Sequence, residues 1–187
     1  MLVMIADVRL MLHIARTIDA LNELVGRTVA WLVLAAVLVS SGNALSRYAF
    51  NLSSNAWLEI QWYLFSAIFL LAAGYTLKAG AHVRIDILYG RYSARGRAWL
   101  DIFGAIFFLL PMALLILYLS WFVFMQSYTG HEISSDAGGL IRWPVKLLMP
   151  VGFALLVLQG LSEILKRVAF LRGEAPLEES AKRLDVT

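Results

Sequence analysis

Residues 102–130 read IFGAIFFLLPMALLILYLSWFVFMQSYTG, and no side chain in this stretch carries a charge. An α-helix rises about 1.5 Å per residue, so about 20 apolar residues cross the roughly 30 Å hydrocarbon core of a bilayer. This run exceeds that length, which predicts a transmembrane helix that tilts or protrudes. Pro111 lies inside it, and because a proline frees a carbonyl one turn earlier, we expect a kink nearby.

Three more uncharged runs occur along the chain, at residues 28–46, 60–77 and 147–162. They lack the apolar and polar alternation of barrel strands, and a chain with so few spans cannot close a barrel. We therefore predict an all-α integral membrane protein, built as one membrane domain (1–172) with a polar tail (173–187). Its four transmembrane helices are expected at about 28–47, 58–78, 100–128 and 144–166.

The segment before the first run predicts an additional element. Its apolar residues recur at spacings of three and four, with charges on the other face. This pattern is typical of an amphipathic helix that lies on a membrane surface. Because the segment is not the short basic region of a cleavable signal peptide, we expect the first span to be retained. The apolar residues are Ile5, Val8, Leu12, Ala15, Ile18, Leu21, Leu24 and Val25.

The lysines and arginines predict the orientation, because cytoplasmic loops of membrane proteins are enriched in them. The side of the predicted membrane domain opposite the termini and the middle loop has only Arg47, Arg142 and Lys146. The side with the termini and the middle loop has many more, so we expect it in the cytoplasm. This side has Arg9, Arg16, Arg27, Lys78, Arg84, Arg91, Arg95, Arg97, Lys166, Arg167, Arg172, Lys182 and Arg183.

Composition and motifs argue against several classes of protein. Hydrophobic residues make up 60% of the chain and charged residues 16%, which is outside the usual range of soluble domains. The basic residues gather at predicted helix ends, so we interpret them as topology signals and expect no nucleic-acid partner. The three histidines fall on opposite sides of the bilayer, so they cannot form a haem pair. No catalytic motif occurs, and we expect no enzyme activity, cofactor or metal.

Two polar clusters flank the predicted spans. Arg47 ends the first span and Glu59 begins the second, close to Trp57 at the predicted outer interface. Either these two charges pair and fix the hairpin, or Glu59 faces a partner, or each side chain reaches the interface alone. The second cluster contains His82, Arg84 and Asp86 and follows the second span. By composition alone this cluster is a basic cytoplasmic loop.

These clusters carry a resemblance to a known family. The motifs Arg47-Tyr48-Ala49-Phe50, Asn55-Ala56-Trp57-Leu58-Glu59 and His82-Val83-Arg84-Ile85-Asp86 occur in order, with Gly74 in the helix between the last two. Together they resemble the small membrane subunit of the tripartite ATP-independent periplasmic (TRAP) transporters, the DctQ-like family. One departure is Ile60, where many members carry a second acidic residue.

The resemblance implies a bacterial inner-membrane complex for sodium-coupled uptake of an organic acid or related solute. A periplasmic binding protein would capture the carboxylate, and a large DctM-like subunit would carry substrate and sodium as an elevator. The present chain would scaffold that subunit in the lipid bilayer. Glu59, Arg142 and Lys146 are then expected near the docking face for the binding protein. The segment from His82 to Asp86 would fix the inner loop or contact the large subunit.

Two other functions are compatible with four apolar spans. One is a membrane anchor or assembly subunit of a redox complex. The other is a self-sufficient exporter, which normally requires an acidic residue inside a span.

Overall fold

The protein is a bundle of long helices, seen in a computed structural model that describes residues 2–51, 54–80 and 92–173, with side chains from residue 8 onward. Four helical rods are long and apolar enough to cross a membrane, which confirms the predicted fold class. Within the described residues the only β-pairing is an isolated bridge between Ile133 and Ile141. The elements are α1 (Leu2–Phe50), α2 (Asn55–Lys78), α4 (Ala94–Gly104), the π-helical turn η1 (Ala105–Leu109), α5 (Leu110–Thr129) and α6 (Trp143–Leu171).

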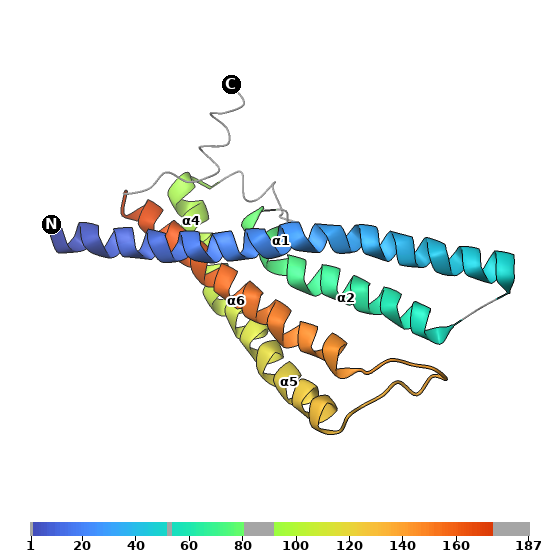
Figure 1. Cartoon of the computed structure of the whole chain (residues 1–187). Coiled ribbons are helices and arrows are strands. Elements are labelled where there is room, and N and C mark those ends of the chain that lie inside the picture. The colour runs from blue at the N-terminus through green and yellow to red at the C-terminus, as the bar shows by residue number, and fades with distance from the viewer. Residues whose placement is uncertain (1, 52–53, 81–91, 174–187) are drawn as a thin grey trace.

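Helix α6 is the centre of the bundle, because it packs against α1, α2 and the rod formed by α4, η1 and α5. Figure 1 shows α1 crossing α6 near the C-terminal half of α6, while α2 runs beside both helices. We call the end that holds Lys78 and Arg167 the inner end, after the orientation that the charges predict. The end that holds Phe50 and Asn55 is the outer end.

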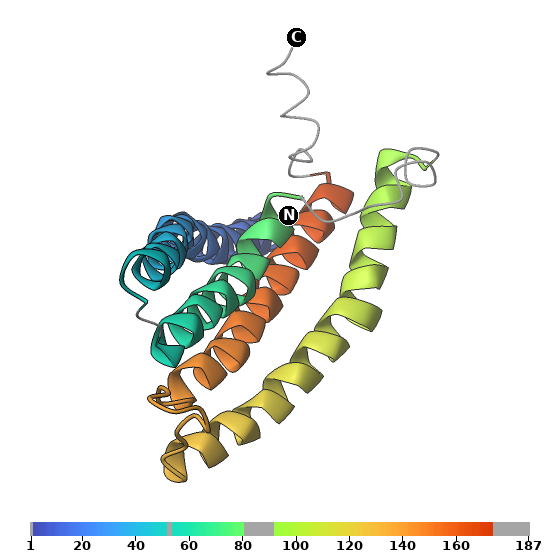
Figure 2. The ribbon, with the colours of Figure 1, turned by 90° about the vertical axis from the view of Figure 1, so that its right-hand side faces the viewer.

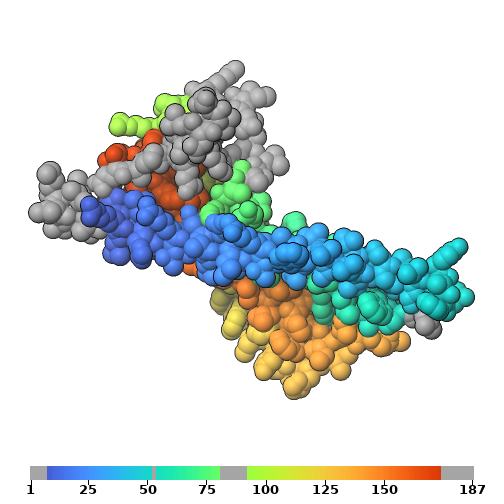
Figure 3. Space-filling view, turned by 45° about the horizontal axis from the view of Figure 1, so that its top comes forward, coloured from blue at the N-terminus to red at the C-terminus, as the bar shows by residue number. Residues whose placement is uncertain are grey.

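Helix α1 is a single helix of 49 residues, about 74 Å long at 1.5 Å per residue. The sequence predicted two elements here, a surface helix and a first span. No proline interrupts the segment, so nothing in the backbone chemistry forces a break between them. Figure 3 shows α1 extending along the whole face of the molecule. Its length is more than twice the hydrocarbon thickness, so part of it must tilt or lie outside the core.

One stripe of α1 faces the bundle, and we call it the α1 seam. Its members repeat with spacings of three, four and seven residues, which is the pattern of helices that pack side by side. Leu21 and Leu24 lie off this stripe and are 42% and 65% exposed. The buried members are Val8, Ala15, Asp19, Asn22, Gly26, Val29 and Ala36.

Three glycines allow the helices to approach closely. A Cβ on Gly74 of α2 would lie 2.1 Å from Asn22 Oδ1 of α1 and 3.2 Å from the carbonyl oxygen of Leu155 in α6. A Cβ on Gly152 would lie 2.6 Å from the Leu70 carbonyl oxygen, and one on Gly26 would overlap the Tyr75 ring. Small residues permit such close packing of membrane helices. The close crossing of α1, α2 and α6 therefore requires glycine, which has no side chain, at these three positions.

The expected distortion near Pro111 takes the form of the π-helical turn η1, which ends two residues before the proline. A π-turn relieves the clash of the proline ring with the preceding turn by inserting an extra residue. Figure 2 shows α4, η1 and α5 as one continuous, curved rod. The rod contacts α6 along its length.

The glycine crossing gives a first prediction. Gly74→Ala should lower the melting temperature of the purified protein in detergent by several degrees, because the new methyl group overlaps Asn22. The matched control is Gly42→Ala, since a Cβ at Gly42 meets nothing within 4 Å. That control should be neutral or slightly stabilising, because alanine favours a helix over glycine by about 0.5–1 kcal/mol. Tryptophan fluorescence on heating measures both. Equal melting temperatures for the two variants would contradict the close crossing.

Candidate functional site

The polar groups of the described residues gather mainly in two places, one at each end of the bundle. The inner cluster consists of Asp19, Asn22, Gln159, Ser162 and Lys166. Asp19 Oδ1 accepts hydrogen bonds from Ser162 Oγ at 2.7 Å and Gln159 Nε2 at 2.8 Å. Asp19 Oδ2 pairs with Lys166 Nζ at 3.1 Å. One carboxylate of α1 therefore binds three side chains of α6.

Asn22 lies one turn further along α1 and is fully buried. Its amide group donates to Gln159 Oε1 at 3.0 Å, to the Ile18 carbonyl at 3.3 Å and to the Leu155 carbonyl at 3.5 Å. Its Oδ1 has no hydrogen-bond partner among the described residues and lies over the backbone of Gly74. Asn22 thus contacts both other helices at the crossing.

Further ion pairs join the other helices at the inner end. Lys78 of α2 pairs with Glu23 of α1 at 2.7 Å, and Arg167 of α6 pairs with Asp101 of α4 at 3.2 Å. Glu163 pairs with Lys166 at 2.5 Å. Charges leave water at a large cost unless they are paired, so these contacts favour one arrangement of the helix ends. The inner end is tied across all four rods.

Sequence reasoning missed this cluster. It interpreted Asp19 as one of the charges on the polar face of a surface helix and Gln159 as a packing residue. The signal that finds Asp19 is the spacing of the α1 seam, because Ala15, Asp19, Asn22 and Gly26 alternate by four and three residues. A polar residue on such a stripe is expected to meet a polar partner.

The outer cluster is centred on Glu59 of α2. Its carboxylate accepts hydrogen bonds from the Ser134 hydroxyl and from the Leu140 backbone N–H, the latter at 2.6 Å. Arg142 in turn donates to Ser134 Oγ at 3.2 Å. Glu59 and Arg142, which the sequence predicted to lie on the same side, are thereby brought together through Ser134.

The loop between α5 and α6 folds back on itself and lies against α2. Within the loop, Ser134 N–H donates to the Leu140 carbonyl, and Arg142 N–H donates to the Glu132 carbonyl, both at 3.0 Å. Gly138 has a φ of +72°, a conformation that glycine adopts without strain. Asn55 and Tyr63 of α2 donate to carbonyls of the same loop. A cavity of about 330 Å³ lies beneath it, lined in part by Glu59 and Lys146.

Lys146 at the start of α6 forms an ion pair with Glu132 in the loop. The hydrogen bond from Lys146 holds the pKa of the Glu132 carboxyl below its ordinary value of 4.5. The ionised form is therefore favoured in the folded protein. The contribution of the pair is full above pH 4.5 and is lost as the pH falls through the lowered pKa. At neutral pH the loop is held at both of its ends.

The remaining predicted residues lie elsewhere. Arg47 does not pair with Glu59 in this structure, because the Glu59 carboxylate is bound by Ser134 and Leu140 instead. Arg47 lines a groove between α1 and α2. Trp57 is 47% exposed near the outer end of α2. His82, Arg84 and Asp86 lie outside the described residues. Within the described part of the chain, no three histidine or acidic side chains converge as a metal site requires.

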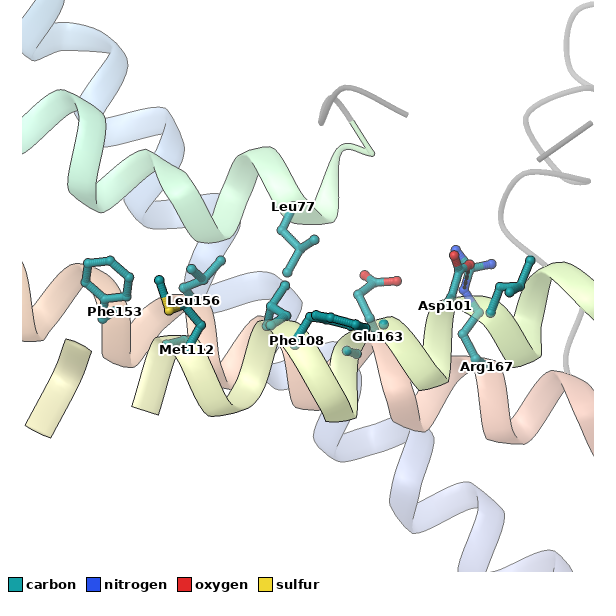
Figure 4. Close-up of a pocket in the computed structure, with 14 residues that line it drawn as sticks. Leu77, Asp101, Phe108, Met112, Phe153, Leu156, Glu163 and Arg167 are labelled. Carbon is teal, nitrogen blue, oxygen red and sulfur yellow. Dashed lines mark ion pairs between the residues drawn. The ribbon is translucent and has the colours of Figure 1, made fainter. Parts of the chain in front are cut away.

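A second groove runs along α6 toward the inner end. Its volume is about 530 Å³, and most of its lining is apolar, including Phe108, Met112 and Phe153. Figure 4 shows these side chains along its length, with Asp101, Arg167 and Glu163 toward one end. The groove can take an apolar chain, and only its inner end offers charged groups.

Four membrane-length helices with ionic groups at their two ends define a multi-pass α-helical membrane protein. The family model described as "Tripartite ATP-independent periplasmic transporters, DctQ component" matches residues 36–170. The chain belongs to this family and is a small membrane component of a TRAP transporter, a family of transporter components rather than of enzymes. A search of the curated proteins and one of the solved structures find no match.

The outer cluster gives a second prediction. Glu59→Ala should speed hydrogen exchange of the Leu140 amide, because that amide loses its acceptor. The control is Glu132→Ala, which removes a different acidic side chain of this loop that makes no bond to the Leu140 amide. Hydrogen exchange read at the single Leu140 amide, by fragmenting a peptide that covers residues 130–142 in the mass spectrometer, measures both. Similar exchange of this amide in the two variants would disprove the bond to Glu59.

Proposed function

We propose that this protein is the scaffold subunit of a TRAP transporter that takes up an organic acid or related solute by sodium coupling in a bacterial inner membrane. The family supports the assignment to a transporter with a large DctM subunit and a binding protein. The uncharged middle of each span supports a scaffold role, because coordinating sodium and a carboxylate would require polar ligands at that depth. The substrate and sodium sites then reside in the large subunit.

The proposed orientation places both termini and the middle loop in the cytoplasm. The charge bias of the sequence supports it, and so does the N-terminal half of α1. Leu10, Ile14 and Leu24 are exposed on one side of that half, while Arg9 and Arg16 are exposed on another. A helix with these two faces suits the boundary between acyl chains and headgroups. His82, Arg84 and Asp86 would then fix the inner loop or contact the large subunit.

The outer cluster is the proposed docking region for the binding protein. Glu59, Arg142 and Lys146 lie around the loop that forms the outer surface of the bundle between α5 and α6. Arg142 and Lys146 are half-buried and are engaged by Ser134 and Glu132. A charge reversal at these positions therefore changes the fold of the loop as well as any contact with the binding protein.

The assignment to the transporter is tested by co-purification. An affinity-tagged copy of the chain, expressed with the large membrane subunit of the same transporter, should retain that subunit in detergent at equal stoichiometry. A tagged four-helix membrane protein from another family is the control. Recovery of the chain without the large subunit would reject the scaffold role.

The docking role gives a further prediction that separates charge from fold. In Glu132→Lys/Lys146→Glu the ion pair is preserved in reversed order, so the melting temperature and the complex should stay near wild type. Uptake in proteoliposomes should fall several-fold, because a charge that faces the binding protein is reversed. Lys146→Glu alone places two acidic side chains together. This variant should lose uptake, and the amides of the α5–α6 loop should exchange hydrogen faster. If the swapped variant takes up substrate at the wild-type rate, Lys146 stabilises the loop and does not contact the binding protein.

A further inference from the structure

The outer halves of α1 and α2 enclose a polar groove, which we call the α1–α2 groove. Its volume is about 710 Å³, and it lies beside Ser40, Asn43 and Arg47 of α1 and Gln61 of α2. Figures 1 and 2 show the outer ends of these helices standing apart. Ala44, Tyr48 and Asn51 complete the lining.

The polar residues of the groove continue the α1 seam. Ala36 is the last fully buried member, and the same alternation of four and three residues leads to Ser40, Asn43 and Arg47. Ser40 and Arg47 are exposed and Asn43 is half-buried. Inside the bundle this stripe packs against other helices. In its outer half, Ser40 and Arg47 stay exposed beside α2.

Arg47 differs from the cations at the other helix contacts. Lys78, Lys146, Lys166 and Arg167 each pair with a carboxylate. Arg47 forms no hydrogen bond or ion pair with any residue that the structure describes, and the lining of its groove contains no acidic side chain. Arg47 is exposed near the outer end of α1, so its charge is accessible to a partner. The groove therefore complements a negatively charged group.

The chemistry of the groove favours a helix over a lipid as its occupant. Seven residues separate Ser40 from Arg47, so the polar stripe extends about 10 Å inward from the arginine. A lipid phosphate satisfies Arg47, but its acyl chain then lies against Asn43, Ser40 and Gln61. Hydrogen-bonding side chains on a neighbouring helix satisfy the whole stripe. The groove along α6 is mostly apolar, so its occupant does not need hydrogen-bonding side chains along its length.

We propose that the α1–α2 groove receives a transmembrane helix of the large subunit, with an aspartate or glutamate of that helix paired with Arg47. This inference rests on the proposed scaffold function and names the α1–α2 groove as the surface that binds the large subunit. Asn43 and Gln61 add hydrogen bonds across the interface, and the seam spacing sets the register of the incoming helix.

Variants at Arg47 test the ion pair. Arg47→Ala should reduce the amount of large subunit that co-purifies by about tenfold or more, the loss expected when a buried carboxylate is left unpaired. Arg47→Lys should restore much of it. Arg16→Ala is the control, because Arg16 is also an exposed cation of α1. The isolated Arg47→Ala subunit should melt like wild type, which separates a lost interface from a lost fold.

Photo-crosslinking tests the occupant. A benzophenone amino acid is placed at Ser40 in the groove or at Leu38, which is 63% exposed and lies about 160° away around the helix. On irradiation of native membranes, position 40 should yield an adduct with the large subunit in excess over position 38. Adducts with lipid alone at position 40 would overturn the inference.

Failure of the scaffold function and failure of the groove interface give different results. If wild-type chain does not retain the large subunit, the scaffold function itself is wrong and the groove inference falls with it. If wild type retains the subunit and Arg47→Ala retains it equally, the scaffold function stands and the groove is not its interface.

Discussion

The carboxylate of Asp19, shared by Ser162, Gln159 and Lys166, decides where α1 crosses α6. A nearly buried charge is tolerated only where several groups compensate it, so shifting α1 by one residue along α6 would leave both sides unpaired. Apolar contacts in a bilayer give little such direction, because lipid tails are as apolar as leucine. The polar contact therefore fixes the register of α1 on α6, which apolar contacts alone would not fix. The position of α2, which packs against both helices, depends on this register.

Glycines make that contact possible. Asn22 reaches Leu155 and Gln159 of α6 because Gly74 removes the side chain that would otherwise stand in its place. Gly152 allows α2 to approach α6 in the same way. The hydrogen bonds of Asn22 and the close approach of the helix backbones thus depend on each other at a single crossing. This crossing joins three rods, and the fourth packs along α6, with the Asp101–Arg167 pair at its inner end.

The two ends of the bundle have different character. At the inner end, the cations Lys78, Lys166 and Arg167 are engaged within the chain. At the outer end, Glu59 closes the loop onto α2, while the outer half of α1 stands apart with its polar stripe uncovered. Lys78, Lys166 and Arg167 therefore stabilise contacts within the chain, whereas Arg47 at the outer end has no such partner among the described residues.

The sequence by itself determined the four spans and the family, because uncharged runs of membrane length and short ordered motifs are local properties of the chain. It also placed Glu59 and Arg142 on one side. It did not show that α1 is unbroken, that Glu59 binds the α5–α6 loop instead of Arg47, or that Asp19 is a helix contact. Asp19 and Lys166 are 147 residues apart in the chain. Only the tertiary structure decided these pairings, because a polar side chain in a membrane protein takes whichever partner the packing of the helices brings within hydrogen-bond distance, and no local pattern records that choice.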